Sequence, residues 1–391
     1  MTRRIARRDV MRTGGGLISA LALDGCVGGP VQQQQASLPS VRASMDRLIK
    51  ITVCTRPFRA DGPRLDVEKI GDKVVIHNYG HGGSGWSLSW GSSTIATNKA
   101  MATGTRSIAV IGCGALGLTS ATLLQRAGYP VTIYAKDRPP QVRSSFATGL
   151  WTPDSRICLE EKATPEFRQL WQTMRDTSFA AYQNYLGLPG EPVEWIDFYR
   201  LSGGPDRPPP IPPTGNDIKF AELQGDLPDI REYRADDLTG VANPFPRYKT
   251  RRSANMMFNL IEYQHLLYTD FLAAGGHIET REFHSPADFS RLPQKVLVNC
   301  TGYGARALFN DDSVIPVRGQ LARLIPQAEI NYGLYYNHVS FVPRRDGLVI
   351  QSTGSDEGVG YGDTSTEPNR AEAADAVATI ASIFEPPATN A

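Results

Sequence analysis

A glycine turn between two apolar strands constrains the fold of this chain more than any other stretch. Residues 107–137 read SIAVIGCGALGLTSATLLQRAGYPVTIYAKD, which predicts a buried strand, a turn, a helix and a second buried strand. The turn has the spacing Gly112-x-Gly114-x-x-Gly117. Gly112 permits a tight turn, Gly114 lets the backbone approach a pyrophosphate, and Gly117 lets the helix lie close to the strand. This order predicts a dinucleotide-binding unit with the phosphates at the helix N-terminus. The alternative is a glycine-rich turn in another kind of α/β protein.

The end of the second strand supplies the acidic residue that such a unit needs. An aspartate or glutamate is expected about 20 residues after the glycines, where it binds the ribose hydroxyls. Asp137 occupies this place, and the alternative is a surface aspartate in a turn before two prolines. Because Lys136 and Arg138 flank it, a 2′-phosphate and therefore NADP stay open at this point.

Composition excludes several classes of protein. A chain of 391 residues is long enough for two domains and a large core. Its net charge of +1 gives no reason to expect a nucleic-acid partner, and no run of about 18 apolar residues predicts a membrane span. The cysteines form no CxxC pair and no metal-ligand spacing, so we expect free thiols and no metal site.

The first residues differ from the rest of the chain and predict export. Arginines precede the apolar stretch 17–23, and RRDVMR at 7–12 resembles a twin-arginine signal. The residues before Cys26 resemble a lipoprotein box, so we expect residues 1–26 to be a signal and Cys26 to be acylated, with ordinary cleavage as the alternative. The protein would then lie in the periplasm or be anchored to the outer membrane of a bacterium. Residues 27–48 are expected to be a polar linker.

A second glycine-rich segment precedes the dinucleotide unit. Residues 75–92 read VIHNYGHGGSGWSLSWGS, and such glycines allow close backbone approach and successive N–H groups aimed at one anion. The alternative is a glycine-rich hairpin. The proline-rich residues 204–214 are expected to be an insertion without a role in the site.

Seven segments together resemble the D-amino-acid oxidase family of FAD enzymes. They are VIGCGALGL (110–118), AKDRPPQVRSSFATGLWTP (135–153), VNCTGYGA (298–305), VRGQ (317–320), YYNHVSFVP (335–343), TRPFR (55–59) and VIHNYGHGGSGWSLSWGS (75–92). The resemblance implies an α/β fold in which a Rossmann-type FAD-binding domain carries a substrate domain with a mixed or antiparallel sheet.

The order of these segments differs from that of the family. There the RPxR and HNYGHGG segments come last, whereas here they come first, so the chain resembles a circular permutant. The resemblance implies an FAD-binding domain of residues 49–155 with 275–320. The substrate domain would be 156–274 with 321–391, its terminal helix 370–384 packing back on the FAD domain. Residues 49–100 should then fold onto 106–153, and the two chain ends should be neighbours.

The family chemistry implies a set of FAD-binding residues. They are Gly112, Gly114, Leu116 and Gly117 at the pyrophosphate, Lys136 and Asp137 at the ribose, Ser144, Ser145, Gly149 and Leu150 along the phosphates and flavin, Phe283 on the adenine side, Thr301 on the cofactor, and Gly82, Ser84, Gly85, Trp86 and Ser87 at the isoalloxazine edge.

The resemblance also implies three substrate-binding residues and a reaction. Arg56 would hold the substrate carboxylate with a two-point ion pair, the Gly83 carbonyl would accept from the ammonium, and Tyr336 would lie beside the substrate. A hydride would pass from the substrate Cα to flavin N5 without a side-chain base. The imine would hydrolyse to a 2-oxo acid and ammonia, and molecular oxygen would become hydrogen peroxide.

Two departures from the family leave the substrate open. Ser340 stands where the family has a second tyrosine, so either His338 or a water compensates or the substrate differs. The segment from 320 to 340 is shorter than the lid of mammalian-type members, which implies a more open site. The alternatives are a glycine, sarcosine or D-aspartate type of amine oxidase, a nicotinamide dehydrogenase, and an inactive exported binding protein.

Overall fold

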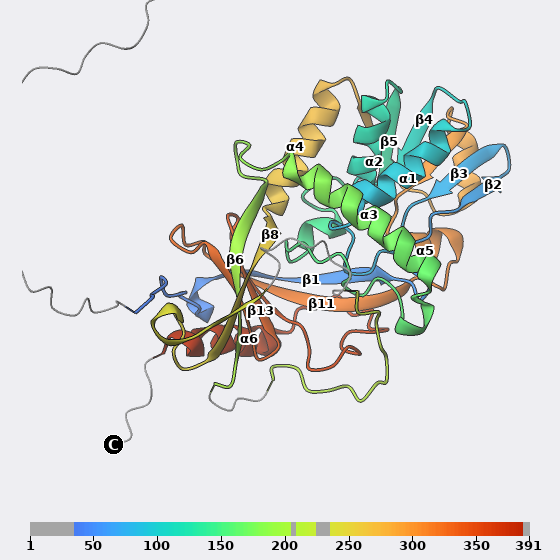
Figure 1. Ribbon diagram of the computed structural model, residues 1–391. Coiled ribbons are helices and arrows are strands. Elements are labelled where there is room, and N and C mark those ends of the chain that lie inside the picture. Colours follow the sequence, from blue (N-terminus) through green and yellow to red (C-terminus); the bar gives the residue numbers. More distant parts are fainter. Residues whose placement is uncertain (1–34, 205–208, 224–234, 386–391) are drawn as a thin grey trace, which may run out of the picture.

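Two β-sheets and the helices around them form the body of the protein (Figure 1). The computed structural model describes residues 35–204, 209–223 and 235–385. The expected signal sequence and Cys26 lie outside these residues. Within them, no helix is long and apolar enough to cross a membrane, and four cysteines are free thiols, namely Cys54, Cys113, Cys158 and Cys300.

The first sheet contains the glycine turn. Its six strands are, in spatial order, β2 (Val67–Ile70), β3 (Lys73–His77), β10 (Val296–Asn299), β4 (Ile108–Ile111), β5 (Val131–Ala135) and β9 (His277–Thr280). All neighbouring pairs are parallel except β2 with β3. Every residue of β4 and β10 is buried, as expected for parallel strands covered on both faces. The buried strand, turn, helix and second strand predicted from the sequence are therefore confirmed.

Helices from distant parts of the chain pack around this sheet. They are α1 (Ser89–Met101), α2 (Ala115–Arg126), α3 (Pro165–Gln183), α4 (Leu260–Ala273) and the short α5 (Gly304–Phe309). The helix α2 that follows the glycine turn packs between α1 and α4, while α1 also packs on α3. Because β3 pairs with β10 and α1 packs on α2, residues 73–101 complete the domain built around the glycine turn. The expectation that the early segment folds onto residues 106–153 is therefore confirmed for residues 73–101.

The second sheet has eight strands. In spatial order they are β1 (Leu48–Phe58), β11 (Ile315–Leu324), β14 (Gly347–Ser352), β13 (Val339–Arg344), β12 (Tyr332–Tyr336), β6 (Val193–Ser202), β8 (Lys249–Phe258) and β7 (Asp236–Leu238). The strands are antiparallel except for β12 and β6, so the expected mixed sheet of the substrate domain is present. The helix α6 (Arg370–Phe384) packs on β14, β11 and β13.

Two expected domain assignments are wrong. The terminal helix α6 packs on the eight-stranded sheet and not on the FAD-binding domain, because its apolar residues share one cluster with the side chains on that face. The strand β1 pairs along its length with β11, so residues 48–58 belong to the substrate-domain sheet although they precede the nucleotide-binding strands.

The two ends of the described chain are neighbours, as expected. The Gln35 side chain donates to the Asn243 carbonyl at 2.5 Å, and the ring of Phe384 lies 6.1 Å from that of Phe245. Val41 is only 4% exposed and belongs to the same apolar cluster as α6. The expectation of a polar linker is therefore wrong for residues 35–48, because apolar side chains and backbone hydrogen bonds fix them to the body.

We predict that Gly117→Ala destabilises the protein, because an added Cβ would lie 2.0 Å from the Gly112 carbonyl oxygen. The free energy of unfolding should fall by about 1–3 kcal/mol, which is the usual cost of overpacking. Gly304→Ala is the matched control, since its Cβ would meet only Thr301 Cβ at 3.7 Å. Urea unfolding of both variants checks this, and equal stability of the two would contradict it.

Candidate active site

A cavity of about 930 Å³ lies where the two sheets meet. The carboxyl ends of β4, β5 and β10 border it on one side, and β1, β8, β13 and β14 border it on the other. Segments 81–87 and 142–156 close the remaining walls. A ligand site outside the carboxyl ends of parallel strands is the usual arrangement in open α/β sheets.

The glycine turn has the geometry of a phosphate cradle. Gly112 has φ of +106°, and a Cβ there would lie 2.5 Å from the Cys300 carbonyl oxygen. Gly114 is the N-cap of α2, and the Ala115 amide donates a hydrogen bond to Ser144 Oγ at 3.1 Å. Backbone N–H groups at a helix N-terminus favour an anion. The turn therefore leaves room for a close approach to its backbone, and the helix N-terminus behind it favours the negative charge of a pyrophosphate.

Asp137 follows β5 and lines the cavity, as the ribose-binding role requires. The two basic neighbours are engaged elsewhere. Lys136 lies 3.5 Å from Glu282, and Arg138 donates to Thr280 Oγ1 at 2.8 Å. These contacts favour an unmodified ribose over a 2′-phosphate at this position.

Hydrogen bonds fix segment 81–87 to segment 144–155. Trp86 Nε1 donates to the Ser144 carbonyl at 2.9 Å, and the Thr152 amide donates to Ser87 Oγ at 2.8 Å. The Gly83 amide donates to the Ser155 carbonyl at 2.9 Å. The second glycine-rich segment is therefore a wall of the same cavity as the first.

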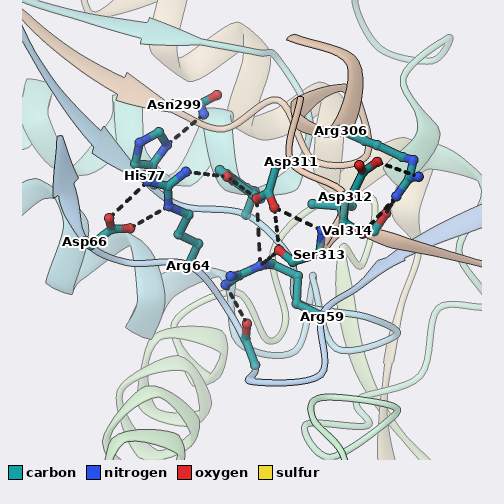
Figure 2. A network of polar contacts seen from close by, with 12 residues as sticks. Arg59, Arg64, Asp66, His77, Asn299, Arg306, Asp311, Asp312, Ser313 and Val314 are labelled. Atoms are coloured by element: carbon teal, nitrogen blue, oxygen red, sulfur yellow. Dashed lines mark hydrogen bonds and ion pairs between the residues drawn. The ribbon is translucent and has the colours of Figure 1, made fainter. Parts of the chain in front are cut away.

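A polar network holds the early segment at its other end (Figure 2). Arg59 Nε donates to Ser313 Oγ at 2.8 Å, and the Tyr79 hydroxyl donates to Asp311 Oδ2 at 2.7 Å. Arg64 in turn donates to the Tyr79 hydroxyl at 3.0 Å. These contacts join the loop after β1 and the segment after β3 to the loop after α5.

His81 is a buried histidine without a hydrogen-bond partner on either ring nitrogen among the described residues. It is 1% exposed and borders the cavity beside the Gly82 turn. Burial lowers the pKa of His81 to about 3, so the ring is neutral at physiological pH.

Arg56 reaches the cavity from the end of β1. Its Nη1 donates to the Arg318 carbonyl at 3.1 Å, and its guanidinium lies over Gly319. A Cβ at residue 319 would lie 2.6 Å from both terminal nitrogens, so the glycine of the VRGQ segment makes room for this side chain. Ser340 lines the cavity nearby.

Most of the residues that the sequence predicted for the site line this cavity. They are Arg56, Gly82, Gly83, Gly85, Trp86, Ser87, Gly112, Gly114, Leu116, Lys136, Asp137, Ser144, Gly149, Leu150, Phe283 and Thr301.

Three predicted cofactor residues act behind the wall. Gly117 lies inside α2 and permits its close packing on the turn. The Ser145 hydroxyl donates to Gln264 at 2.6 Å, and the Ser84 hydroxyl bonds the carbonyls of Thr152 and Ser155 at 3.1 Å. Direct contact between these three residues and a cofactor is not supported, because all are buried and none lines the cavity.

The prediction that Tyr336 lies beside the substrate is wrong, because Tyr336 does not line the cavity. Tyr336 packs on Tyr248 with 5.1 Å between ring centres and lies in the cluster that α6 covers. Tyr335 is paired with Ser340, so these two side chains share the opposite face of the sheet. The alternation of side chains along a strand explains the error.

His338 is not placed to compensate for the missing tyrosine. It forms the hairpin turn between β12 and β13 with φ of +60°, and it does not line the cavity. Sequence reasoning instead missed Arg156, Gln351 and Thr353, which do line it. Arg156 follows directly after a segment assigned to the cofactor, which was the one available signal.

The proline-rich segment is also closer to the site than expected. Pro210, Ile211, Pro212 and Thr214 line a smaller cavity of about 400 Å³. This cavity shares Arg56, Arg156 and Thr353 with the larger one. The expectation that the insertion has no part in the site is therefore wrong for its described residues.

Comparison with known proteins finds similar flavoenzymes. Residues 107–196 match the family described as FAD dependent oxidoreductase (DAO). The chain is 29% identical to a D-amino-acid oxidase of Rubrobacter xylanophilus over 288 residues, which are 71% of this chain and 76% of that protein. It is 25% identical to a D-amino-acid oxidase of Dictyostelium discoideum over 284 residues, or 70% and 72% of the two chains. The crystal structure of a glycine oxidase from Geobacillus kaustophilus aligns with a TM-score of 0.43 at 14% identity, over 71% of this chain and 76% of that one.

The fold, the phosphate cradle and the family match define an FAD-dependent oxidoreductase. Within that class, the chain is similar to the D-amino-acid oxidases. The residues present fit FAD, because the cradle admits no side chain at Gly112 and an aspartate follows β5. FAD would be held by the glycine turn, Asp137 and segment 82–87.

We predict that His81 makes the protein less stable in acid. Its folded pKa lies below the ordinary value of 6.5, so its contribution is complete above pH 6.5 and is lost as the pH falls toward 3. Between pH 7 and pH 5 the wild type should lose about 2 kcal/mol more than His81→Gln. Urea unfolding at both values measures this. The exposed His265→Gln is the control, and a loss in His81→Gln equal to that of the wild type would contradict the prediction.

Proposed function

We propose that this protein oxidises D-amino acids to 2-oxo acids, ammonia and hydrogen peroxide, with water and molecular oxygen consumed. The observation that carries the proposal is Arg56, which lines the cavity together with segment 82–87 and has no carboxylate partner among the described residues. An arginine without an ion-pair partner is suited to bind a carboxylate through two parallel hydrogen bonds.

The substrate-binding groups come from two parts of one continuous segment. Arg56 ends β1 and would bind the α-carboxylate, while the Gly83 carbonyl would accept a hydrogen bond from the amino group. Because Gly83 is bonded to Ser155 and Arg56 lies over Gly319, both groups are held in place before a substrate arrives. Holding the reactant in one orientation supplies a large part of the rate in such reactions.

Bound FAD would supply the acceptor for the hydride that leaves the substrate Cα. The chain itself would orient the Cα–H bond and exclude water. No histidine or carboxylate is required as a base when the amine reacts in its neutral form. His81, the buried histidine of the site, is neutral and contributes no charge to this step.

We predict that Arg56→Met lowers kcat/KM for every D-amino acid that the wild type oxidises. Removing one partner of a buried charge pair costs about 2–5 kcal/mol, which corresponds to a loss of roughly 30-fold to several thousand-fold. Peroxide release from separate D- and L-amino acids, glycine and sarcosine measures the effect. Arg252→Met, on the exposed side of β8, is the control.

Flavin content should not change in Arg56→Met, since the phosphate cradle is separate from this arginine. An unaltered kcat/KM in Arg56→Met would contradict the assigned role of Arg56. Turnover of glycine or sarcosine alone would favour the amine oxidase alternative. A purified protein without flavin absorbance would contradict the FAD site.

We also propose that the chain is circularly permuted relative to the order that the resemblance implies. The neighbouring chain ends and the packing of residues 48–101 on both sheets support this. Permutation leaves packed contacts intact when the ends lie close together at the surface.

A further inference from the structure

Two arginines reach the same part of the cavity from different elements. Arg56 ends β1, whereas Arg156 follows the segment that is bonded to residues 81–87. Both line the main cavity and the smaller cavity behind it, and together with Thr353 they form the wall that the two share. Their charges are close enough for Arg56 to lower the pKa of Arg156.

Arg156 is held in a defined place. Its backbone has φ of +50°, and its carbonyl oxygen would lie 1.8 Å from a Cβ on Gly82, so only a glycine fits opposite. Its guanidinium lies 5.5 Å from the centre of the Phe220 ring, and Nη2 lies 3.5 Å from the Thr353 carbonyl. Its Nε is buried and has no partner among the described residues.

No described carboxylate forms an ion pair with either guanidinium. In the described ranges, no aspartate or glutamate oxygen lies within 4.0 Å of a nitrogen of Arg56 or Arg156. Burial and the Arg56 charge lower the pKa of Arg156 to about 10, so the side chain is still charged at neutral pH. The charge of Glu357 raises the pKa of Arg156 without a direct ion pair. Oε2 of Glu357 instead accepts a hydrogen bond from the Phe220 amide at 2.6 Å.

Two acidic residues of the smaller cavity form ion pairs with a different arginine, Arg318. Arg318 lies 3.5 Å from Glu372 and 3.9 Å from Asp363. Asp375 also borders this cavity, but on the exposed face of α6. Among the described residues, no carboxylate therefore balances the two positive charges of the shared wall, and a bound ligand would supply the balancing anions.

We propose that Arg156 binds a side-chain carboxylate, so that the preferred substrates are D-amino acids with an acidic side chain. This inference rests on the proposed function. A neutral amino acid brings one carboxylate and one ammonium, which leaves the two guanidinium charges without net compensation. An aspartate or glutamate adds the second anion, and burying paired charges is far less costly than burying unpaired ones.

One other use of Arg156 is possible at the same site. It could bind the α-carboxylate together with Arg56, in place of the tyrosine that Ser340 replaces. The two uses differ in one respect. Loss of a side-chain contact affects acidic substrates only, whereas loss of an α-carboxylate contact affects every substrate.

The test compares acidic with neutral D-amino acids on the FAD-bound enzyme. The variants are Arg156→Met, which keeps the length and removes the charge, Arg156→Lys, which keeps the charge, and the control Arg252→Met on the exposed side of β8. The substrates are D-aspartate, D-glutamate, D-alanine and D-norvaline. We expect the wild type to favour an acidic substrate. Arg156→Met should lower kcat/KM for that substrate ~100-fold, mainly through KM, and change the neutral ones less than ~3-fold. Arg156→Lys should lie between Arg156→Met and the wild type, and Arg252→Met should match the wild type.

A binding measurement separates this inference from the proposed function. Succinate should raise the melting temperature of the wild type more than butyrate does, and Arg156→Met should abolish that difference. If no D-amino acid is oxidised, the proposed function fails. The succinate measurement alone then tests whether Arg156 binds a second carboxylate. Equal losses for acidic and neutral substrates in Arg156→Met, a wild type that favours neutral substrates, or no succinate preference would each overturn the inference.

Discussion

The site depends on the hydrogen bonds between segments 81–87 and 144–155. These bonds place the second glycine-rich segment opposite the glycine turn, although the two are separated in the chain by α1 and β4. Without them the cavity would keep the glycine turn that binds the phosphates but would lose the wall near Arg56, where the substrate would bind. The glycines at 82 and 83 are needed for the same reason, because a side chain at either would collide with residues 155–156.

The early segment also joins the two sheets. Its first strand, β1, lies at the edge of the eight-stranded sheet, and β3 lies in the six-stranded sheet. The cofactor end and the substrate end of the cavity are therefore built from one stretch of about forty residues in addition to the dinucleotide unit. Arg56 and Gly83 come from this stretch, and Arg156 comes from the segment that is hydrogen-bonded to it. The residues proposed to bind the substrate are therefore held by the same two bonded segments.

The sequence predicted the parts with strong local signals. The strands and helix predicted within residues 107–137 and the terminal helix 370–384 agree with the structure, because buried apolar runs and a clear helical period mark them. The strands β6 and β8 were not predicted, and Tyr336 was assigned to the wrong face, since both depend on pairings between distant residues. Arg156 was missed for the same reason: its place is set by Gly82, about seventy residues earlier, and not by its neighbours in the chain.

Reordering the chain tests the central claim most directly. The reordered chain starts at Thr105, in the exposed turn between α1 and β4, runs to Glu385, and continues through a flexible linker of about ten residues into residues 35–103. If residues 48–92 complete the flavin site by contacts that do not depend on chain order, this protein should bind FAD in a 1:1 ratio. Its affinity should match that of the wild type within about threefold. A folded, reordered protein that does not retain FAD would contradict the account.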